Sequence, residues 1–209
     1  MTDSPLKTHS DLPGWCNYHN LYDEAVARVP DGGTLVEIGC WLASSSAYLY
    51  KIAKESGKDL TLVFIDTWAG EVGQDAHAET VAAHNGDLFP QWKQNMIDCG
   101  ADLNGTHPRV ITHQCLSTEG AAFFADNSLD FVFVDAAHDY DSVRADILAW
   151  LPKLKPTGHI AGHDYAWHEV KKAVEELLTV VPNGACWERF PAPGMAEVKP
   201  PRTCLGILG

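Results

Sequence analysis

The stretch that most constrains this chain is residues 34–49, where an apolar run leads into a turn of small residues and then into a helix-like segment. The run suits a strand buried on both faces, and it ends at Gly39, whose missing Cβ lets a ligand approach the backbone. Residues 43–46 would open the helix, with its first N–H groups pointing at that ligand. This order predicts a nucleotide site in which Gly39 and Ser44 contact the ligand.

The same turn lacks both glycine-rich motifs that hold phosphate groups. Neither G-x-G-x-x-G nor G-x-x-x-x-G-K-[ST] is present, which argues against NAD and against a nucleoside triphosphate. Glu37, at the end of the strand, is poorly placed for a pyrophosphate and well placed for a cationic group such as the ammonium of an amino acid. The turn therefore predicts a ligand that carries a positive charge.

Apolar runs alternate with helical patterns along the rest of the chain, which predicts an open α/β sheet. Strands are expected at 34–38, 60–66, 110–115, 129–138 and 159–165, and helices at 18–28, 43–55, 91–99, 140–154 and 168–180. Segments 185–190 and 203–208 would close the sheet as a hairpin. We expect a Rossmann-like sheet, mostly parallel with a C-terminal antiparallel strand, and helices on both faces.

The predicted domain covers residues 34–209, preceded by an arm and a helix in residues 1–33. Residues 69–90 are rich in Gly, His, Asp and Asn and follow the C-terminal end of a strand. Such an insertion is more often a substrate loop or lid than an idle linker. We expect the arm and this insertion to shape the ligand pocket.

Charge and cysteine usage exclude several classes of partner. The formal net charge of −13 would repel a phosphate backbone on average, so nucleic acid is not expected. No stretch has the uninterrupted apolar length of a membrane span, and the first residues lack the apolar centre of a signal peptide. The six cysteines include no C-x-x-C pair and are interpreted as free thiols. A cytoplasmic protein without a membrane partner is expected.

In an open α/β sheet, ligands bind outside the carboxyl ends of the strands. Four predicted strand ends carry acids or histidines, namely Glu37 with Gly39, Asp66 with Trp68, Asp135 with His138, and His163 with Asp164. A single acid at such a position is often a helix cap or a solvated group. Four of them at one edge of one sheet predict a functional site.

The second strand ends at Asp66, where a carboxylate can accept both hydroxyls of a ribose or, alternatively, cap a following turn. Trp68 could cover one face of an adenine or belong to the core. Ser117 and Glu119 follow the third strand, where they could meet the other side of the base. A simple helix cap is an equal alternative for this pair.

Asp135 and Asp164 end two further strands, with His138 and His163 beside them. Two carboxylates and a histidine are suitable ligands for Mg²⁺, Mn²⁺ or Fe²⁺. The alternative is that the acids cap helices while the histidines bond to the backbone. His138, one turn beyond Asp135, could complete the metal shell or stay free as a general base.

Four segments of the chain resemble the class I S-adenosylmethionine-dependent methyltransferases. They are VEIGCWLASSSAYL, VFIDTWAG, STEGAAFF and the long run from SLDFVFVDAAH to GHDY. The similarity covers roughly residues 34–180, and the VDAAH and GHDY blocks are its specific parts. It is closest to a small bacterial subgroup that includes macrocin-type sugar O-methyltransferases and cephalosporin hydroxylase-like proteins. Where relatives often have a glycine, this chain has Ala43.

The resemblance implies a cofactor site for S-adenosylmethionine. By this likeness, Glu37 and Gly39 line the methionine end of the cofactor, and Asp66 holds its ribose. Ser117 and Glu119 would approach the adenine. The resemblance also suggests dimers or larger assemblies.

The resemblance further implies metal ligands at Asp135 and Asp164, with His163 at a position where relatives carry another ligand, usually acidic. His138 matches a position proposed as the base in the sugar-modifying members. We therefore expect O-methylation of a small hydroxylated molecule, assisted by a divalent cation such as Mg²⁺, with Asp135 and His138 as catalytic residues. The alternatives are a metal-independent N-methyltransferase, a hydroxylase-like protein, and a binding protein that keeps the cofactor without catalysis.

Overall fold

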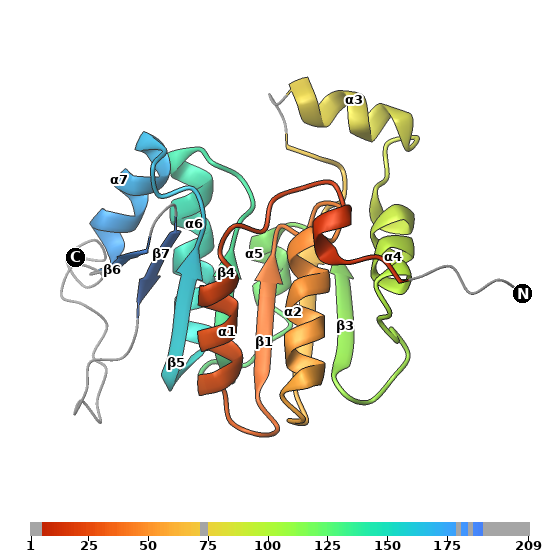
Figure 1. Ribbon diagram of the computed structural model, residues 1–209. Helices are drawn as coiled ribbons and strands as arrows, with labels where there is room; N and C mark the ends of the chain where they lie inside the picture. The colour runs from red at the N-terminus through yellow and green to blue at the C-terminus, as the bar shows by residue number, and fades with distance from the viewer. Residues whose placement is uncertain (1–5, 72–74, 179–180, 184–185, 190–209) are drawn as a thin grey trace, which may run out of the picture.

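The computed structural model describes residues 6–71, 75–178, 181–183 and 186–189, which form one sheet flanked by helices (Figure 1). The strands are β1 (Thr34–Ile38), β2 (Thr61–Asp66), β3 (Arg109–Gln114), β4 (Leu129–Val134), β5 (Leu154–Gly162), β6 (Val181–Asn183) and β7 (Cys186–Arg189). The helices are α1 (His19–Arg28), α2 (Ser44–Glu55), α3 (Asp75–Ala83), α4 (Phe89–Asp98), α5 (Ser117–Ala121), α6 (Tyr140–Trp150) and α7 (His168–Leu177), with short 3-10 turns η1 (His9–Asp11) and η2 (Leu151–Lys153).

The sheet has the strand order β3-β2-β1-β4-β5-β7-β6. Strands β1 to β5 are parallel to one another, as β1 pairs with β2 and β4, β2 with β3, and β4 with β5. The order reverses between β1 and β4, which makes their carboxyl ends the topological switch point where ligands bind in such sheets. The five parallel strands confirm the predicted Rossmann-like fold class.

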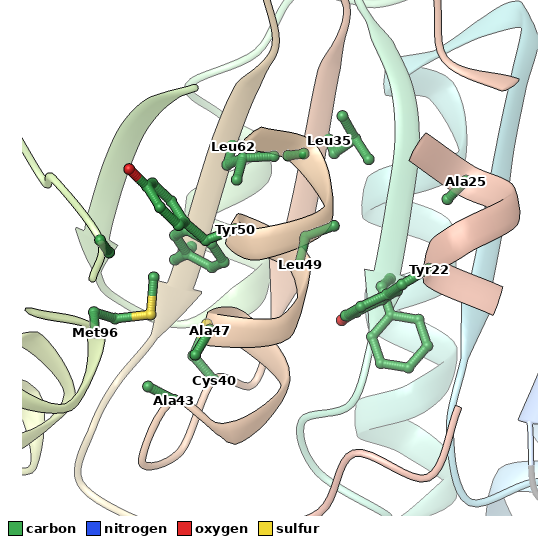
Figure 2. Close-up of a cluster of buried hydrophobic side chains, with 14 of the residues drawn as sticks. Tyr22, Ala25, Leu35, Cys40, Ala43, Ala47, Leu49, Tyr50, Leu62 and Met96 are labelled. Carbon is green, nitrogen blue, oxygen red and sulfur yellow. The ribbon is translucent and has the colours of Figure 1, made fainter. Parts of the chain in front are cut away.

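Alternate residues of the buried strands serve two separate cores, because successive side chains point to opposite faces of a sheet. One core joins Leu35 and Phe133 to α1, α2 and α4, and part of it is drawn in Figure 2. The other core joins Val36 and Val134 to α6 and α7. Figure 1 shows α1 and α2 in front of the sheet and α5 and α6 behind it. Helices therefore cover both faces, as the sequence predicts.

Several element bounds differ from the sequence-based expectation. Strand β4 ends at Val134 instead of 138, so the acid and histidine that follow it lie in a loop beyond the sheet. Strand β5 ends at Gly162, which likewise leaves residues 163–165 outside the sheet. The insertion at 69–90 contains a helix, α3, which lies beyond the carboxyl ends of the strands (Figure 1).

The C-terminal part of the sheet is antiparallel. Strand β7 pairs with β5, with Ile160 opposite Arg189, and β6 pairs with β7. The predicted partner strand at 203–208 lies outside the described residues, and β6 occupies that place beside β7. Within the described part of the chain, every helix is too short or too polar for a membrane span.

Candidate active site

The turn between β1 and α2 requires Gly39 for the packing of the chain, and the contact of Gly39 with a ligand stays a prediction. Gly39 has a φ of +84°, and a Cβ at this position would lie 1.9 Å from the backbone oxygen of Asp135. The glycine therefore lets the ends of β1 and β4 approach each other, and the Asp135 N–H donates to the Ile38 oxygen at 2.8 Å. The atoms closest to this glycine therefore belong to the backbone that follows β4.

Two other residues of the turn adopt the left-handed conformation without being glycine. Trp41 has a φ of +45° and Ala43 a φ of +76°. Such a conformation costs about 1 kcal/mol or more for a residue with a Cβ. Ala43 directly precedes α2 and is fully buried beside Cys40 and Ala47 (Figure 2). The turn thus keeps the shape that glycine favours, although the chain has alanine there.

Asp66, at the end of β2, holds this turn in place. Its Oδ2 accepts hydrogen bonds from the N–H groups of Cys40 at 2.7 Å and Trp41 at 2.9 Å. Its Oδ1 accepts from the Trp68 N–H at 2.7 Å. Burial raises the pKa of Asp66, and these N–H groups oppose that effect. The alternative interpretation, a carboxylate that caps a turn, is therefore what the structure shows, and the contact with a ribose stays a prediction.

Glu37 is a buried carboxylate with one unsatisfied oxygen. The residue is 0% exposed, and its Oε1 accepts a hydrogen bond from the Tyr22 hydroxyl at 3.0 Å. Among the described residues, no hydrogen bond of good geometry reaches Oε2. Burial raises the pKa of Glu37 to about 7, against the opposing effect of nearby hydroxyl groups. A cationic donor would satisfy this oxygen and favour the charged form.

Beyond β4 and β5, the structure brings together the four predicted acids and histidines. His138 Nε2 lies 2.7 Å from Asp164 Oδ2, and His163 Nδ1 lies 3.0 Å from the same oxygen. His163 Nδ1 also lies 3.5 Å from Asp135 Oδ1. All four side chains line a pocket at the carboxyl edge of the sheet, over apolar side chains of β4, α6 and α7.

The candidate metal ligands differ from the predicted set in one member. Within the described residues, the ligand atoms of Asp135, His138 and Asp164 lie within 4.8 Å of one another. His163 contacts this group through Nδ1, and its Nε2 donates to Asn17 Oδ1 at 3.0 Å, but it is not a member of this set of three. The geometry therefore brings His138, in place of His163, within reach of a cation held by the two carboxylates, where it could complete the metal shell or stay free as a base.

The carboxylates of this cluster raise the pKa of both its histidines. Burial lowers the pKa of His138, but Asp164 and Glu71 outweigh that effect and raise it to about 9. Burial also lowers the pKa of His163, but Asp135 and Asp164 outweigh that effect and raise it to about 10. Burial raises the pKa of Asp164, while both histidines hold it well below its usual range. A divalent cation would replace protons here, since metal-bound histidine is neutral.

Four residues of the site could not be identified from the sequence. Glu71 Oε2 lies 2.9 Å from His138 Nδ1, and the ring of Trp167 packs 4.8 Å from that of His138. Tyr18 donates its hydroxyl proton to Asp135 Oδ2 at 3.1 Å, next to Asn17. The arm and the insertion that carry three of them were predicted to shape the pocket, but no pattern marks the individual side chains.

Trp68 belongs to the core, which was the alternative to its role as an adenine cover. Its side chain is 1% exposed and packs against Phe89 at 4.4 Å and Trp92 at 5.4 Å between ring centroids. Trp68 has a φ of +51° two residues beyond the end of β2, and this backbone conformation accompanies the turn of its side chain into the core. In this structure, the indole faces α4 and cannot cover a bound base.

The remaining predicted cofactor residues have local partners. Ser44 Oγ donates to the backbone oxygen of His9 at 3.1 Å, and Ser117 Oγ accepts from Trp150 Nε1 at 2.9 Å. Glu119 accepts from the backbone N–H of the residue that precedes α5, at 3.2 Å. Helix capping thus accounts for Glu119, and the contact of these three residues with a cofactor stays a prediction.

The chain matches a known class of protein. A family model described as a methyltransferase domain matches residues 36–165, which is more than half of the chain. The chain belongs to this methyltransferase family. The match confirms the predicted resemblance to class I S-adenosylmethionine-dependent methyltransferases, a family of enzymes, and it includes every predicted site residue.

Several solved structures share the fold, among them two methyltransferases. The O-methyltransferase NovP is 16% identical, with a TM-score of 0.62, and the likeness covers 82% of this chain and 78% of that one. The calicheamicin methyltransferase CalS11 has the same identity and TM-score, with 82% and 76% covered. A protein of Corynebacterium glutamicum is 15% identical, with a TM-score of 0.61, and 90% and 87% covered. At these identities the likeness concerns the fold alone.

One relative matches in sequence. The uncharacterized protein y4gI of Sinorhizobium fredii is 30% identical over 104 residues, which make up 48% of this chain. These residues span 10% of y4gI, so this methyltransferase chain corresponds to a small part of that longer relative.

Proposed function

We propose that this chain is an S-adenosylmethionine-dependent O-methyltransferase that acts on a small hydroxylated molecule with the help of a divalent cation. The observation that supports this most is the convergence of Asp135, His138 and Asp164 at the switch point of a methyltransferase sheet. A protein that only binds the cofactor has no need of this group. The position agrees with the rule that ligands bind where the strand order reverses.

The residues around the β1–α2 turn fit the cofactor. S-adenosylmethionine supplies an activated methyl group on a sulfonium. The unsatisfied Oε2 of Glu37 offers an acceptor to an ammonium group, and Asp66 remains the candidate for the ribose. The protein's part is mainly alignment of donor and acceptor, which can contribute several kcal/mol to lowering the barrier.

The carboxylates of Asp135 and Asp164 would hold the cation, because carboxylate oxygens are the ligands that hard divalent ions prefer. Such an ion lowers the pKa of a bound hydroxyl and fixes its direction. His138 would accept the hydroxyl proton at Nε2. With a pKa raised to about 9, His138 is protonated at neutral pH in the free site. Positive charge placed beside Asp164 lowers that pKa and prepares His138 as a base.

A metal-independent methyltransferase is the second candidate, and one observation favours it. Asp135 and Asp164 each already have a histidine partner, so both carboxylates are paired without a cation. Methyl transfer that survives exhaustive chelation would support this candidate and exclude the first. Amine acceptors would then be tested beside hydroxyl acceptors.

The first test is a calorimetric titration of S-adenosylhomocysteine, the demethylated cofactor, into the chelator-treated protein, repeated with Mg²⁺. We expect micromolar binding, and a change of heat on adding Mg²⁺ that depends on Asp135. Absence of binding in both conditions would overturn the proposed function. Binding without any effect of Mg²⁺ would leave the metal-independent candidate.

A further inference from the structure

We propose that Glu71 is a positioning residue that orients the imidazole of His138 and assigns its two ring nitrogens to different tasks. The inference rests on the proposed function, in which His138 accepts a proton at Nε2. Glu71 lies in the segment that follows β2, outside every motif that the sequence singles out. It reaches across the carboxyl edge of the sheet to the loop that follows β4.

Both oxygens of Glu71 are engaged with the same residue. Oε1 accepts a hydrogen bond from the backbone N–H of His138 at 3.1 Å, and Oε2 lies 2.9 Å from His138 Nδ1. The side chains of Glu71 and His138 are each only 18% exposed. Two contacts from one carboxylate fix the ring relative to its own backbone. The ring of Trp167, tilted by 31° at 4.8 Å between centroids, limits the remaining rotation.

The direction of these bonds decides where the protons are. An ionised carboxylate only accepts hydrogen bonds, so the Nδ1 atom of His138 must carry a proton to bond with Glu71. The proton that His138 exchanges in catalysis is then the one on Nε2, the atom that lies 2.7 Å from Asp164 Oδ2. Glu71 thereby directs the reactive nitrogen toward the cluster, as carboxylate partners do for histidines in other sites.

A purely structural role is the competing explanation, because the bond to the His138 backbone alone could anchor the loop after β4. A loop anchor would change stability but would not determine the state of the imidazole. The test must therefore observe the Nδ1 proton itself. A hydrogen-bonded ring proton exchanges slowly enough with water to give a visible NMR signal. A ring proton without such a bond exchanges too fast to be seen.

The experiment uses the full chain, labelled with ¹⁵N-histidine, in the presence of S-adenosylhomocysteine. The wild-type protein should show a downfield ring proton on Nδ1 of His138, assigned by its loss in His138→Asn. In Glu71→Ala this signal should disappear. In Glu71→Gln, whose amide oxygen can still accept, it should persist but move upfield. The matched control is Glu169→Ala, which removes an equivalent carboxylate contact, 2.9 Å from Nδ1 of the exposed His168.

An unchanged Nδ1 signal of His138 in Glu71→Ala would overturn the proposal. If Glu71→Ala fails to fold by circular dichroism, Glu71→Gln decides, and an unshifted signal in that variant contradicts the proposal. A change of the His138 signal in Glu169→Ala would also contradict it. Failure of the proposed function is recognised separately, because the wild-type protein would then not bind S-adenosylhomocysteine at all.

Discussion

Tyr18 and Asp135 are 117 positions apart in the chain, and a hydrogen bond of 3.1 Å joins the Tyr18 hydroxyl to Asp135 Oδ2. Tyr18 is 5% exposed, and its ring lies 4.6 Å from that of Phe133 and 5.0 Å from that of His163. Burial and the charge of Asp135 raise the pKa of Tyr18, so it stays a donor. The N-terminal arm therefore forms part of the wall behind the acidic cluster.

Replacement of this phenol should destabilise the protein. Tyr18→Phe removes a buried donor to a carboxylate, and we expect the free energy of unfolding to fall by about 1–2 kcal/mol. Urea denaturation measures the change. Tyr165→Phe is the control, because its hydroxyl bonds to Glu175 on the exposed surface. An equal loss of unfolding free energy in both variants would mean that the Tyr18–Asp135 bond stabilises the protein no more than an exposed hydrogen bond does.

Asp135→Asn should abolish the effect of Mg²⁺ and any methyl transfer, while the affinity for S-adenosylhomocysteine stays unchanged. The amide removes the negative charge that a hard cation requires but keeps the size of the side chain. Calorimetry with and without Mg²⁺ is the measurement. Asp139→Asn serves as the control, because Asp139 caps α6 outside the cluster and asparagine caps equally well. An active Asp135→Asn enzyme would exclude the metal role.

Asp66→Ala should weaken the binding of S-adenosylhomocysteine tenfold or more, a loss of about 1.4 kcal/mol. The variant removes the acceptor for the backbone N–H groups of Cys40 and Trp41 in the turn after β1, and for that of Trp68 beyond β2. Asp31→Ala offers a comparison, since Asp31 also accepts from a backbone N–H, that of Asp59, in a turn before β1. Unchanged affinity in Asp66→Ala would remove this residue from the cofactor site.

Glu37 should make the protein less stable as the pH rises from about 4.5 to 7. Its pKa is near 4.5 in the unfolded chain and about 7 in the folded protein, so the folded state binds more protons in this window. Stability is then lost as pH rises through it, on the order of 3 kcal/mol in total. In Glu37→Gln, the unfolding free energy should depend less on pH. Glu24→Gln, on the exposed side of α1, should behave like the wild type.

Binding of S-adenosylhomocysteine near pH 7 should release protons. An ammonium group beside Glu37 favours its charged form and lowers its pKa, so a bound proton leaves. Calorimetry in buffers of different ionisation enthalpy counts the protons, and Glu37→Gln should release fewer of them. Equal counts for the two proteins would place the ammonium group elsewhere.

The fold could be predicted because its signals are local. All residues of β4 are buried and all but Asp130 are apolar, and such a run followed by an acid can be recognised in the sequence alone. The ends of the strands were less predictable, because the run VDAAH continues the apolar pattern past Val134 after the pairing has stopped. The direction of a side chain was the other difficulty. An aromatic residue after a strand can face either the ligand or α4, and the sequence does not show the backbone conformation that turns Trp68 toward α4.

The contacts within the site could not be predicted from the sequence, for a different reason. Glu71 and His138 are 67 positions apart, and the Tyr18–Asp135 pair is further separated still. Neither pair has a periodicity or spacing that could reveal it. The acids and histidines themselves were predictable, because the carboxyl ends of parallel strands share one edge of a sheet. Their partners depend on how the arm and the insertion fold back over that edge.

The left-handed conformations of Trp41 and Ala43, in a turn that Asp66 holds through the N–H groups of Cys40 and Trp41, imply that the turn after β1 is preorganised. A loop that orders itself only around its ligand loses conformational entropy on binding, and that loss reduces affinity. Here the unfavourable backbone conformations are imposed during folding, by a carboxylate from the neighbouring strand. An incoming nucleoside would meet a rigid surface, and its affinity would reflect the contacts that it makes there.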